Sequence, residues 1–389
     1  MRPLNFSTDQ LIYQLSLSAM VLFCLFAAFQ GGYAIYFFMR IFCLPVSKSS
    51  QVKEHFPVSI IICAKNEAAN LKKNLPSILS QRYSNDAGKA LYEVIVVNDD
   101  SDDDTSRVLM ELEQQYDNLW DVVIAPDAVR DLQGKKYALS KGVAIAGHDW
   151  LLLTDADCIP AGPDWLATMV APLAAGKQIV AGYGGYNHQP GLLNAFIRWE
   201  TIHTFLQYST YALAGIPYMA VGRNLACTKD VFLTVQQSEV WNALPSGDDD
   251  LLISIAGTSA NTAIVCDEPA FTFSNAKTSW HDWVQQKQRH LSTGKYYKNP
   301  AKLLLGVYGI SHAALWLCFF ALLFSHHIMP VLVIMLVRCI IYWFLWTVTT
   351  IKLHEKKLIY LFPFCDIAWM VYNFAFFPYI TWKNKKQWK

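Results

Sequence analysis

Apolar residues in this chain gather in long stretches towards its two ends, and most charged residues lie between them. Residues 11–38 contain no charged residue, and a helix of about 20 apolar residues is long enough to cross a bilayer. Three further stretches are similar in length and composition: residues 303–324, 328–351 and 358–382. The pattern therefore predicts a protein that is held in a membrane at both ends.

The polar block between these stretches has the size of an ordinary enzyme domain. We expect an N-terminal transmembrane anchor at residues 1–45, a soluble domain at 46–300, and a membrane bundle of two or three segments at 301–389. The first stretch is too long for the apolar core of a signal peptide and lacks a cleavage site of small residues. We therefore interpret it as an uncleaved anchor.

Charged residues next to the membrane stretches predict the orientation of the chain. Basic residues flank the soluble block at Arg40, Lys48, Lys53, Lys295, Lys298 and Lys302. Because such flanks stay on the cytoplasmic side, we expect a multi-pass protein of a bacterial cytoplasmic membrane, with its soluble block in the cytoplasm. Four full crossings would place the basic residues 383–386 outside, against the same rule. Since Pro363, Asp366 and Pro378 interrupt the last stretch, it could instead be re-entrant or lie partly in the interface.

Two ionisable residues, Arg338 and Asp366, lie inside the apolar stretches. A charge is costly there and must face protein or water. A structural ion pair and a place on the substrate path are both open for these two residues.

Short apolar runs alternate with helical patterns through the soluble block. Strands are predicted at residues 58–64, 93–97, 121–125 and 151–154. Helices are predicted at residues 70–81, from the turn after the second strand to about Tyr116, and from about Lys135 onwards. This alternation predicts an α/β fold, a mostly parallel sheet with helices on both faces.

Polar residues follow the ends of several predicted strands. Ligands bind beyond the carboxyl ends of parallel strands, and the residues there are Asn66, Glu67, Asp99, Asp155 and Asp157. Asp155 and Asp157 are two residues apart, so in an extended chain their carboxylates point the same way. Such a pair suits a divalent cation that also binds phosphate oxygens. Taken by itself, a motif of this kind is more often a solvated turn after a strand.

Composition excludes several classes of function. The chain has 389 residues, a formal net charge of +1 and 53% hydrophobic residues. Its nine cysteines are scattered without paired spacing, so we expect neither a disulfide framework nor a zinc site. The sequence has no basic patch interleaved with aromatic residues, so we expect no nucleic-acid partner. It does not specify a protein partner.

Six short motifs occur in order through the soluble block. They are residues 58–67, 96–101, 134–136, 155–157, 247–249 and 286–290. Together they resemble the membrane-bound family-two glycosyltransferases, which include cellulose, chitin, hyaluronan and poly-N-acetylglucosamine synthases and ceramide glucosyltransferases. The resemblance covers the whole soluble block, and it implies a GT-A-type nucleotide-sugar-binding domain.

The resemblance implies a UDP-sugar donor and a set of contacts to its nucleotide. Asp99 matches the carboxylate that accepts a hydrogen bond from uracil, although a helix cap is an alternative for this residue. Cys63 and Ala64 would contact the nucleotide through their backbone groups, and Asn66 and Glu67 belong to the same motif.

The resemblance also implies how the diphosphate is held. Asp155 and Asp157 would hold Mg²⁺ or Mn²⁺ between the two phosphates. Lys135 and Lys136 open a helix, and we expect both to face the crevice, where a helix N-terminus and an ammonium group suit a diphosphate. Solvated surface lysines are the alternative.

The acceptor side of the implied site has its own motifs. Asp249 matches the base that takes the acceptor proton, Asp248 stands where glutamate is common, and Asp250 is a fallback for the base. The alternative is that this acidic run only forms the start of a helix, where acidic residues are favoured. Gly222 and Asn224 belong to a segment that resembles the lining of the acceptor site, where glycine permits close approach of a sugar.

A helical motif completes the implied site. Gln286 and Arg289 share one helix face, and Arg289 would clamp the diphosphate. His290 replaces the tryptophan on which an acceptor sugar stacks in the group, which favours a lipid or short acceptor over a polymer. Trp283 could compensate, but a tryptophan on an amphipathic interfacial helix is the favoured interpretation.

These roles predict an inverting, metal-dependent glycosyltransferase. It would move a hexose or N-acetylhexosamine from a UDP-sugar to a lipid or glycan acceptor at the membrane. A processive polysaccharide synthase that secretes its product is one alternative. A membrane protein that binds a nucleotide sugar without catalysis is the other.

Overall fold

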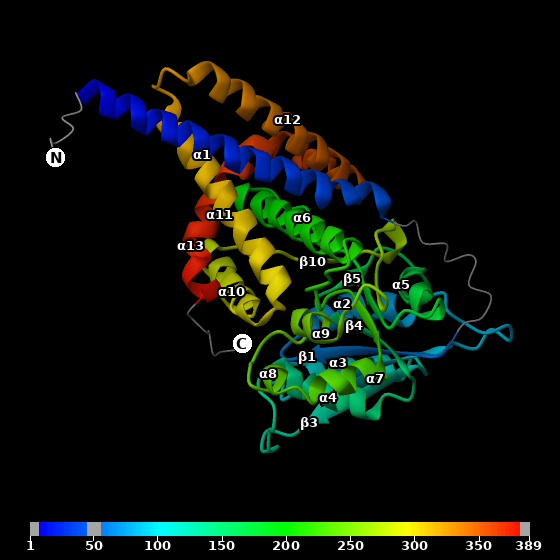
Figure 1. The fold of residues 1–389 in the computed structure, drawn as a ribbon. Coiled ribbons are helices and arrows are strands. Elements are labelled where there is room, and N and C mark those ends of the chain that lie inside the picture. The colour runs from blue at the N-terminus through cyan, green and yellow to red at the C-terminus, as the bar shows by residue number, and fades with distance from the viewer. Residues whose placement is uncertain (1–7, 45–55, 382–389) are drawn as a thin grey trace.

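The computed structural model describes residues 8–44 and 56–381, and it has an α/β part and a bundle of long helices (Figure 1). The long helices are α1 (Thr8–Tyr36), α11 (Asn299–Leu322), α12 (Ile328–Lys352) and α13 (Phe362–Thr381). Lys48, Lys53 and residues 383–386, on which the predicted orientation partly rests, lie outside the described residues.

The α/β part is built on a sheet that has seven strands among the described residues. In pairing order these are β3 (Leu119–Ile124), β2 (Tyr92–Asp99), β1 (Val58–Ala64), β4 (Trp150–Asp155), β8 (Leu225–Thr228), β6 (Ile179–Ala181) and β9 (Thr262–Ile264). The first four are parallel, and β8 is antiparallel to both of its neighbours. A small second sheet pairs β5 (Ile159–Pro160), β10 (Thr272–Ser274) and β7 (Gly184–Tyr186). The predicted α/β fold with a mostly parallel sheet is confirmed.

Successive residues of the central strand β1 point to opposite faces of the sheet, and all of them are buried. Ile60 and Ile62 pack with α2 (Ala68–Leu79), α3 (Thr105–Glu113) and α5 (Trp165–Ala174). Ile61 packs on the other face with α4 (Lys135–Ile145). Helix α4 lies close because residue 142 is glycine: a Cβ there would come within 2.8 Å of Ile61 Cγ2.

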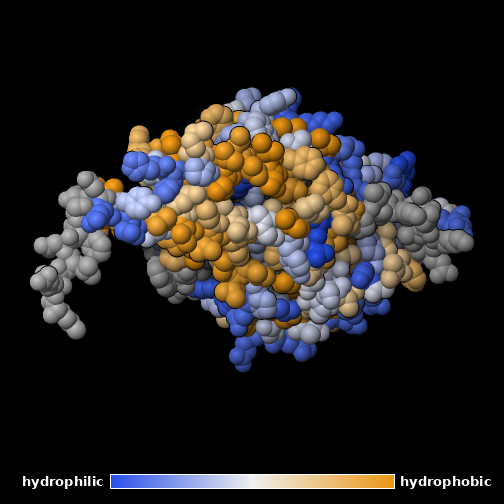
Figure 2. Space-filling model, turned by 45° about the horizontal axis from the view of Figure 1, so that its top comes forward, coloured by the Kyte–Doolittle hydropathy of each residue, from blue (hydrophilic) through white to orange (hydrophobic). Residues whose placement is uncertain are grey.

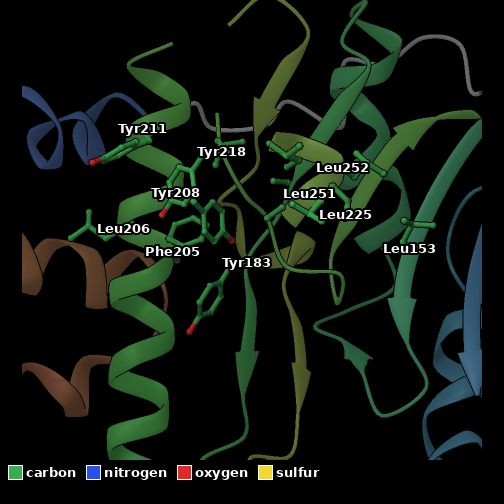
Figure 3. Close-up of a cluster of buried hydrophobic side chains, with 14 of the residues drawn as sticks. Leu153, Tyr183, Phe205, Leu206, Tyr208, Tyr211, Tyr218, Leu225, Leu251 and Leu252 are labelled. Atoms are coloured by element: carbon green, nitrogen blue, oxygen red, sulfur yellow. The ribbon is translucent and has the colours of Figure 1, made fainter. Parts of the chain in front are cut away.

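Helix α6 (Leu192–Leu213) lies between the sheet and the long helices (Figure 1). Its aromatic side chains join both parts in one core. Phe205 and Tyr208 pack near Tyr183 and the leucines of β8 and α9 (Asp250–Ala256), as Figure 3 shows. Tyr211 stacks on Phe37, and its hydroxyl pairs with that of Tyr33 in α1 at 2.8 Å. The orientation of the α/β part relative to the bundle is therefore fixed by packing.

The remaining short elements complete the domain. They are α7 (Lys229–Gln236), α8 (Glu239–Asn242), α10 (Trp280–Leu291), η1 (Phe38–Cys43), η3 (Glu268–Ala270), η4 (Gly294–Tyr296) and η5 (Lys356–Leu361). Of these, α10 and η4 lead from the α/β part into α11.

Four helices of the described chain are long and apolar enough to cross a membrane, which agrees with the predicted stretches. Apolar side chains cover the face that these helices present in Figure 2. Inside the bundle, Asp366 of α13 pairs with Arg338 of α12 and lies 3.2 Å from His312 Nε2 of α11. Of the two interpretations left open for Arg338 and Asp366, the structural ion pair is present.

Candidate active site

A cavity of about 1750 Å³ opens beyond the carboxyl ends of β1 and β4 and continues to α11 and α13. Its sheet end is lined by an acidic group: Asp155, Asp157, Asp248, Asp249 and Asp250. Cys63, Glu67, Lys135, Gly222, Gln286, Arg289 and His290 line the same cavity. The structure thus brings together twelve of the residues that the sequence analysis singled out, counting Asp250.

Asp155 and Asp157 occupy the end of β4 and the turn after it. The turn is closed by the Cys158 N–H, which donates to the Asp155 carbonyl at 3.0 Å. One ligand atom from each of Asp155, Asp157 and Cys158 lies within 4.8 Å of the other two. Two carboxylates that face a cavity fit a hard divalent cation such as Mg²⁺ or Mn²⁺. Burial and the neighbouring Asp155 raise the pKa of Asp157.

The two lysines at the start of α4 have different surroundings. The Lys135 ammonium pairs with Asp155 and lies 3.3 Å from Asp248 Oδ2, inside the cavity. Burial opposes the charge of Asp155, yet Lys135 keeps the pKa of that carboxyl low. Lys136 is fully buried, and its ammonium donates to the carbonyls of Trp241 and Leu244. The expectation that both lysines face the crevice is therefore wrong for Lys136.

Three consecutive aspartates follow Gly247, whose φ of +84° favours glycine. Asp249 accepts hydrogen bonds from the N–H groups of Gly222 at 2.6 Å and Asp250 at 2.8 Å. Burial and the neighbouring carboxylates raise the pKa of Asp249 to about 7. Asp250 instead accepts from the Thr293 hydroxyl, and from the Tyr297 hydroxyl at 2.7 Å. Asp249 is the member of this run that suits proton transfer.

Gly222 and Asn224 lie on either side of a turn before β8. A Cβ on residue 222 would lie 3.2 Å from Asp249 Oδ2, so glycine lets the backbone approach the carboxylate. Asn224 is fully buried and does not line the cavity. Its Oδ1 accepts from Trp165 Nε1, and its Nδ2 donates to the carbonyls of Tyr183 and Ala270. Asn224 holds strands and helix together, against the predicted substrate contact.

Of the other residues predicted to contact the nucleotide, some line the cavity and the rest lie outside it. Asn66 has a φ of +57°, and its Oδ1 accepts the Asp102 N–H at 2.8 Å, so it joins the loops after β1 and β2. Asp99 is fully buried, with Arg130 Nη2 at 2.7 Å from its Oδ1. Asp99 does not cap the helix that follows, and near the start of that helix Asp103 accepts from the N–H groups of Ala68 and Thr105. Ala64, Asn66 and Asp99 do not line the cavity.

Helix α10 presents its motif to the cavity. Gln286, Arg289 and His290 line it, and Arg289 Nη2 lies 3.2 Å from His290 Nε2. The His290 side chain is exposed to the cavity, and desolvation there and the adjacent Arg289 guanidinium hold its pKa well below the usual value. Trp283 faces away, against Phe196 and Phe376. It does not replace the missing stacking surface, and because Trp283 is buried within the protein, its interfacial interpretation stays a prediction.

Sequence reasoning missed one buried cation in the cavity. Arg223 lies over the Tyr186 ring at 4.1 Å, and its Nη1 donates to Ser274 Oγ at 3.1 Å. Its charge favours the ionised forms of Asp155 and Asp157. The segment that contains Arg223 was singled out, but a single arginine in it gave no signal of its position beside the two aspartates.

The geometry can be compared with known proteins. The family model described as "Glycosyl transferase family 2" matches residues 59–219. The probable glycosyltransferase YdaM of Bacillus subtilis is 25% identical over 296 residues, which cover 73% of this chain and 66% of that protein. Glycosyltransferase AglE of Haloferax volcanii is 32% identical over 135 residues, 34% of this chain and 41% of that protein. The chain thus spans less than two thirds of the length of these curated relatives.

Among solved structures, mannosyltransferase PcManGT from Pyrobaculum calidifontis, in complex with GDP-Man and Mn²⁺, is similar with a TM-score of 0.53. It is 16% identical, and the match covers 91% of this chain and 99% of that chain. At this identity the likeness concerns the fold. The family match and the relatives' names support the predicted class of enzyme, a glycosyltransferase. Residues 59–219 match the model of glycosyl transferase family 2, and the α/β part that contains them has the GT-A fold.

Proposed function

We propose that this chain is an inverting, metal-dependent glycosyltransferase that moves a hexose or N-acetylhexosamine from a UDP-sugar to a lipid acceptor in the membrane. One observation carries the proposal. Asp249, whose pKa is raised to about 7, lines the same cavity as Asp155, Asp157 and Arg289. A carboxylate with a pKa near neutrality is suited to act as a general base. Asp155 and Asp157 suit a divalent cation, and Arg289 suits a diphosphate.

Each charged group then has a task. Lys135, at the N-terminus of α4, and Arg289 bind and orient the donor diphosphate. Asp155 and Asp157 would hold the divalent cation, which supplies positive charge to the departing diphosphate when it is bound. Asp249 accepts the proton of the acceptor hydroxyl, whose oxygen forms a bond to the anomeric carbon as the bond to the diphosphate breaks. This single displacement inverts the configuration at that carbon.

The extent of the cavity supports a lipid acceptor. From the acidic end it continues between α11 and α13, where apolar residues such as Leu305, Ala313 and Phe377 line it. Sugar hydroxyls need polar partners, which this part of the cavity offers sparsely. His290 in place of a large aromatic residue adds to the case against a processive synthase. A protein that only binds a nucleotide sugar has no need of a base such as Asp249.

The test uses membranes that contain the full chain, incubated with radiolabelled UDP-sugars. We expect label in the lipid extract and not in a high-molecular-mass fraction. Asp249→Asn should lower product formation by about 10²–10⁴-fold, because the proton then has no acceptor. Asp230→Asn, an exposed aspartate on α7, is the matched control.

Two results would contradict the proposal. Undiminished transfer by the Asp249→Asn variant would remove the base assignment. Binding of UDP without release of sugar from any donor would favour the non-catalytic receptor.

A further inference from the structure

One face of α11 forms a wall of the cavity along about 22 Å of helix, from residue 302 to residue 317. Each wall residue after the first lies three or four positions beyond an earlier one: Lys302, Leu305, Gly306, Gly309, Ala313 and Leu317. Such steps place side chains on one helix face. A Cβ added to Gly306 or Gly309 would meet no atom within 4 Å, so this face is open beside the glycines.

The opposite wall belongs to α13, through Trp369, Tyr372 and Phe377. Ile310 on α11 and Phe374 on α13 line the cavity and remain 65% and 57% exposed. The groove between α11 and α13 therefore opens sideways onto the apolar surface of the bundle. A ligand chain could enter it from within the bilayer. We name it the α11–α13 groove.

Positive charge lies at the end of this groove that is nearer the sheet. Lys295 and Lys302 both line the cavity, and Lys302 Nζ donates to the Lys295 carbonyl at 3.2 Å. Within the described residues, neither ammonium group forms an ion pair with a carboxylate. Lys287, deeper in the cavity, is different because it pairs with Glu200. The groove thus joins an apolar channel to two uncompensated cations.

We propose that the acceptor is an anionic amphiphile, whose apolar chain lies in the α11–α13 groove and whose phosphate lies at Lys295 and Lys302. Charge complementarity selects this occupant over a neutral lipid or a glycan. That the bound amphiphile is an acceptor rests on the proposed function. Its binding in the groove does not depend on turnover. A polyprenyl-type phosphate and a phosphatidic acid share the required chemistry. The P–OH of the monoanionic phosphate supplies the attacking oxygen and gives its proton to Asp249, while the charged oxygen faces the lysines.

Binding is tested first, without turnover. The full-length protein is placed in phosphatidylcholine nanodiscs with a trace of photoactivatable phosphatidic acid or, separately, photoactivatable phosphatidylcholine. After irradiation, peptides are mapped by mass spectrometry. We expect the phosphatidic acid probe to label peptides of α11 and α13, and excess unlabelled polyprenyl phosphate, but not diacylglycerol, to suppress this labelling. Equal labelling by both probes would overturn the proposal, even if the protein proves to be an active glycosyltransferase.

Variants test the two parts of the site. The double change Lys295→Glu and Lys302→Glu should lower labelling by about tenfold, which corresponds to the loss of one good ionic contact. Gly306→Leu should do the same by filling the groove. Matched controls are Lys357→Glu, an exposed lysine in η5, and Leu303→Phe, on the lipid-facing side of α11. Thermal unfolding and UDP binding of each variant verify that it folds.

Turnover separates the possible sources of the anion. Polyprenyl phosphate and phosphatidic acid are compared with diacylglycerol as acceptors. In the lysine variants we expect the KM for an anionic acceptor to rise about tenfold, with the KM for the donor unchanged. Equal use of diacylglycerol would contradict the anionic head group. If no acceptor is glycosylated while labelling is selective, the proposed function fails and the lipid site stands.

Discussion

At the scale of single residues, three consecutive aspartates have three different surroundings. Asp248 faces Lys135, Asp249 is held by two backbone N–H groups, and Asp250 is held by hydroxyl groups. Burial and the charges of Asp248 and Asp250 keep the pKa of Asp249 near 7. The residue type is the same at each position, so only the surroundings separate the proposed base from its neighbours.

The first prediction concerns Asp250. Asp250→Asn removes a negative charge beside Asp249, and this favours the ionised form of Asp249 and lowers its pKa. Because the base must be ionised, activity is lost as the pH falls through its pKa. We therefore expect the acid limb of kcat/KM to move to lower pH in the variant, with activity retained near neutrality. A pH profile from 5 to 9 measures it, with Asp230→Asn as control. Complete loss of activity at all pH values would instead favour Asp250 as the base.

At the scale of elements, the first turn of α4 separates two adjacent lysines. An α-helix has 3.6 residues per turn, so the side chains of neighbouring residues point about 100° apart. Lys135 consequently reaches the cavity, while Lys136 points into the core, where burial lowers its pKa to about 8. Gly142 fixes this arrangement, because the close approach of α4 to β1 and β2 sets which side of its first turn meets the sheet.

The two lysines should therefore respond differently to the same substitution. Lys136→Met leaves the carbonyls of Trp241 and Leu244 without their donor, and we expect it to lower stability by about 1–3 kcal/mol. Lys135→Met should instead lower transfer by about 10²-fold, because it removes a charge at the diphosphate. Thermal unfolding in detergent and the transfer assay measure the pair. If Lys135→Met lowered stability without lowering transfer, and Lys136→Met lowered transfer, then Lys136 and not Lys135 would face the cavity.

At the scale of the whole molecule, α13 stays in contact with the α/β part along its length. The ring centroids of Trp369 and His203 of α6 are 4.3 Å apart, and those of Phe376 and Trp283 of α10 are 5.8 Å apart. Just before α13, Glu355 forms a buried ion pair with Arg198 of α6. Figure 1 shows the end of α13 beside α10. Length and composition allow α13 to cross the membrane, but these contacts favour a helix that remains on the side of the α/β part.

We therefore expect three crossings, with the C-terminus on the same side as the α/β part. This would also place the basic residues 383–386 where the positive-inside rule expects them. In a bacterial host, green fluorescent protein fused after residue 389 should fluoresce, and alkaline phosphatase fused there should be inactive. The same reporters inserted between α11 and α12 are the control and should give the opposite pattern. An active phosphatase at the C-terminus would establish a fourth crossing.

Much of the fold could be predicted because it depends on local pattern. Residues 58–64 were predicted as a strand and form β1 with the same bounds, since a run of branched apolar residues suits a strand buried on both faces. The helix predicted at residues 70–81 is α2, displaced by two residues. Asp155 ends β4 and Asp157 lies in the turn after it, at the strand end where they were predicted, because their place depends only on where a strand ends.

The site could be predicted less completely, since contacts between distant residues decide it. Asn224 lies in a segment chosen correctly, yet its amide is used by Trp165, Tyr183 and Ala270, which its own sequence neighbourhood does not reveal. Arg223, its neighbour, reaches the cavity instead.

The sequence by itself determined the alternation of strands and helices, the apolar spans and the acidic motif at the end of β4, because these depend on residue type and on spacing within one segment. Only the tertiary structure decided which lysine and which aspartate face the cavity, and that this cavity extends from the sheet to the α11–α13 groove. Burial and charge at those positions arise where segments far apart in the chain meet, and no local pattern encodes that meeting.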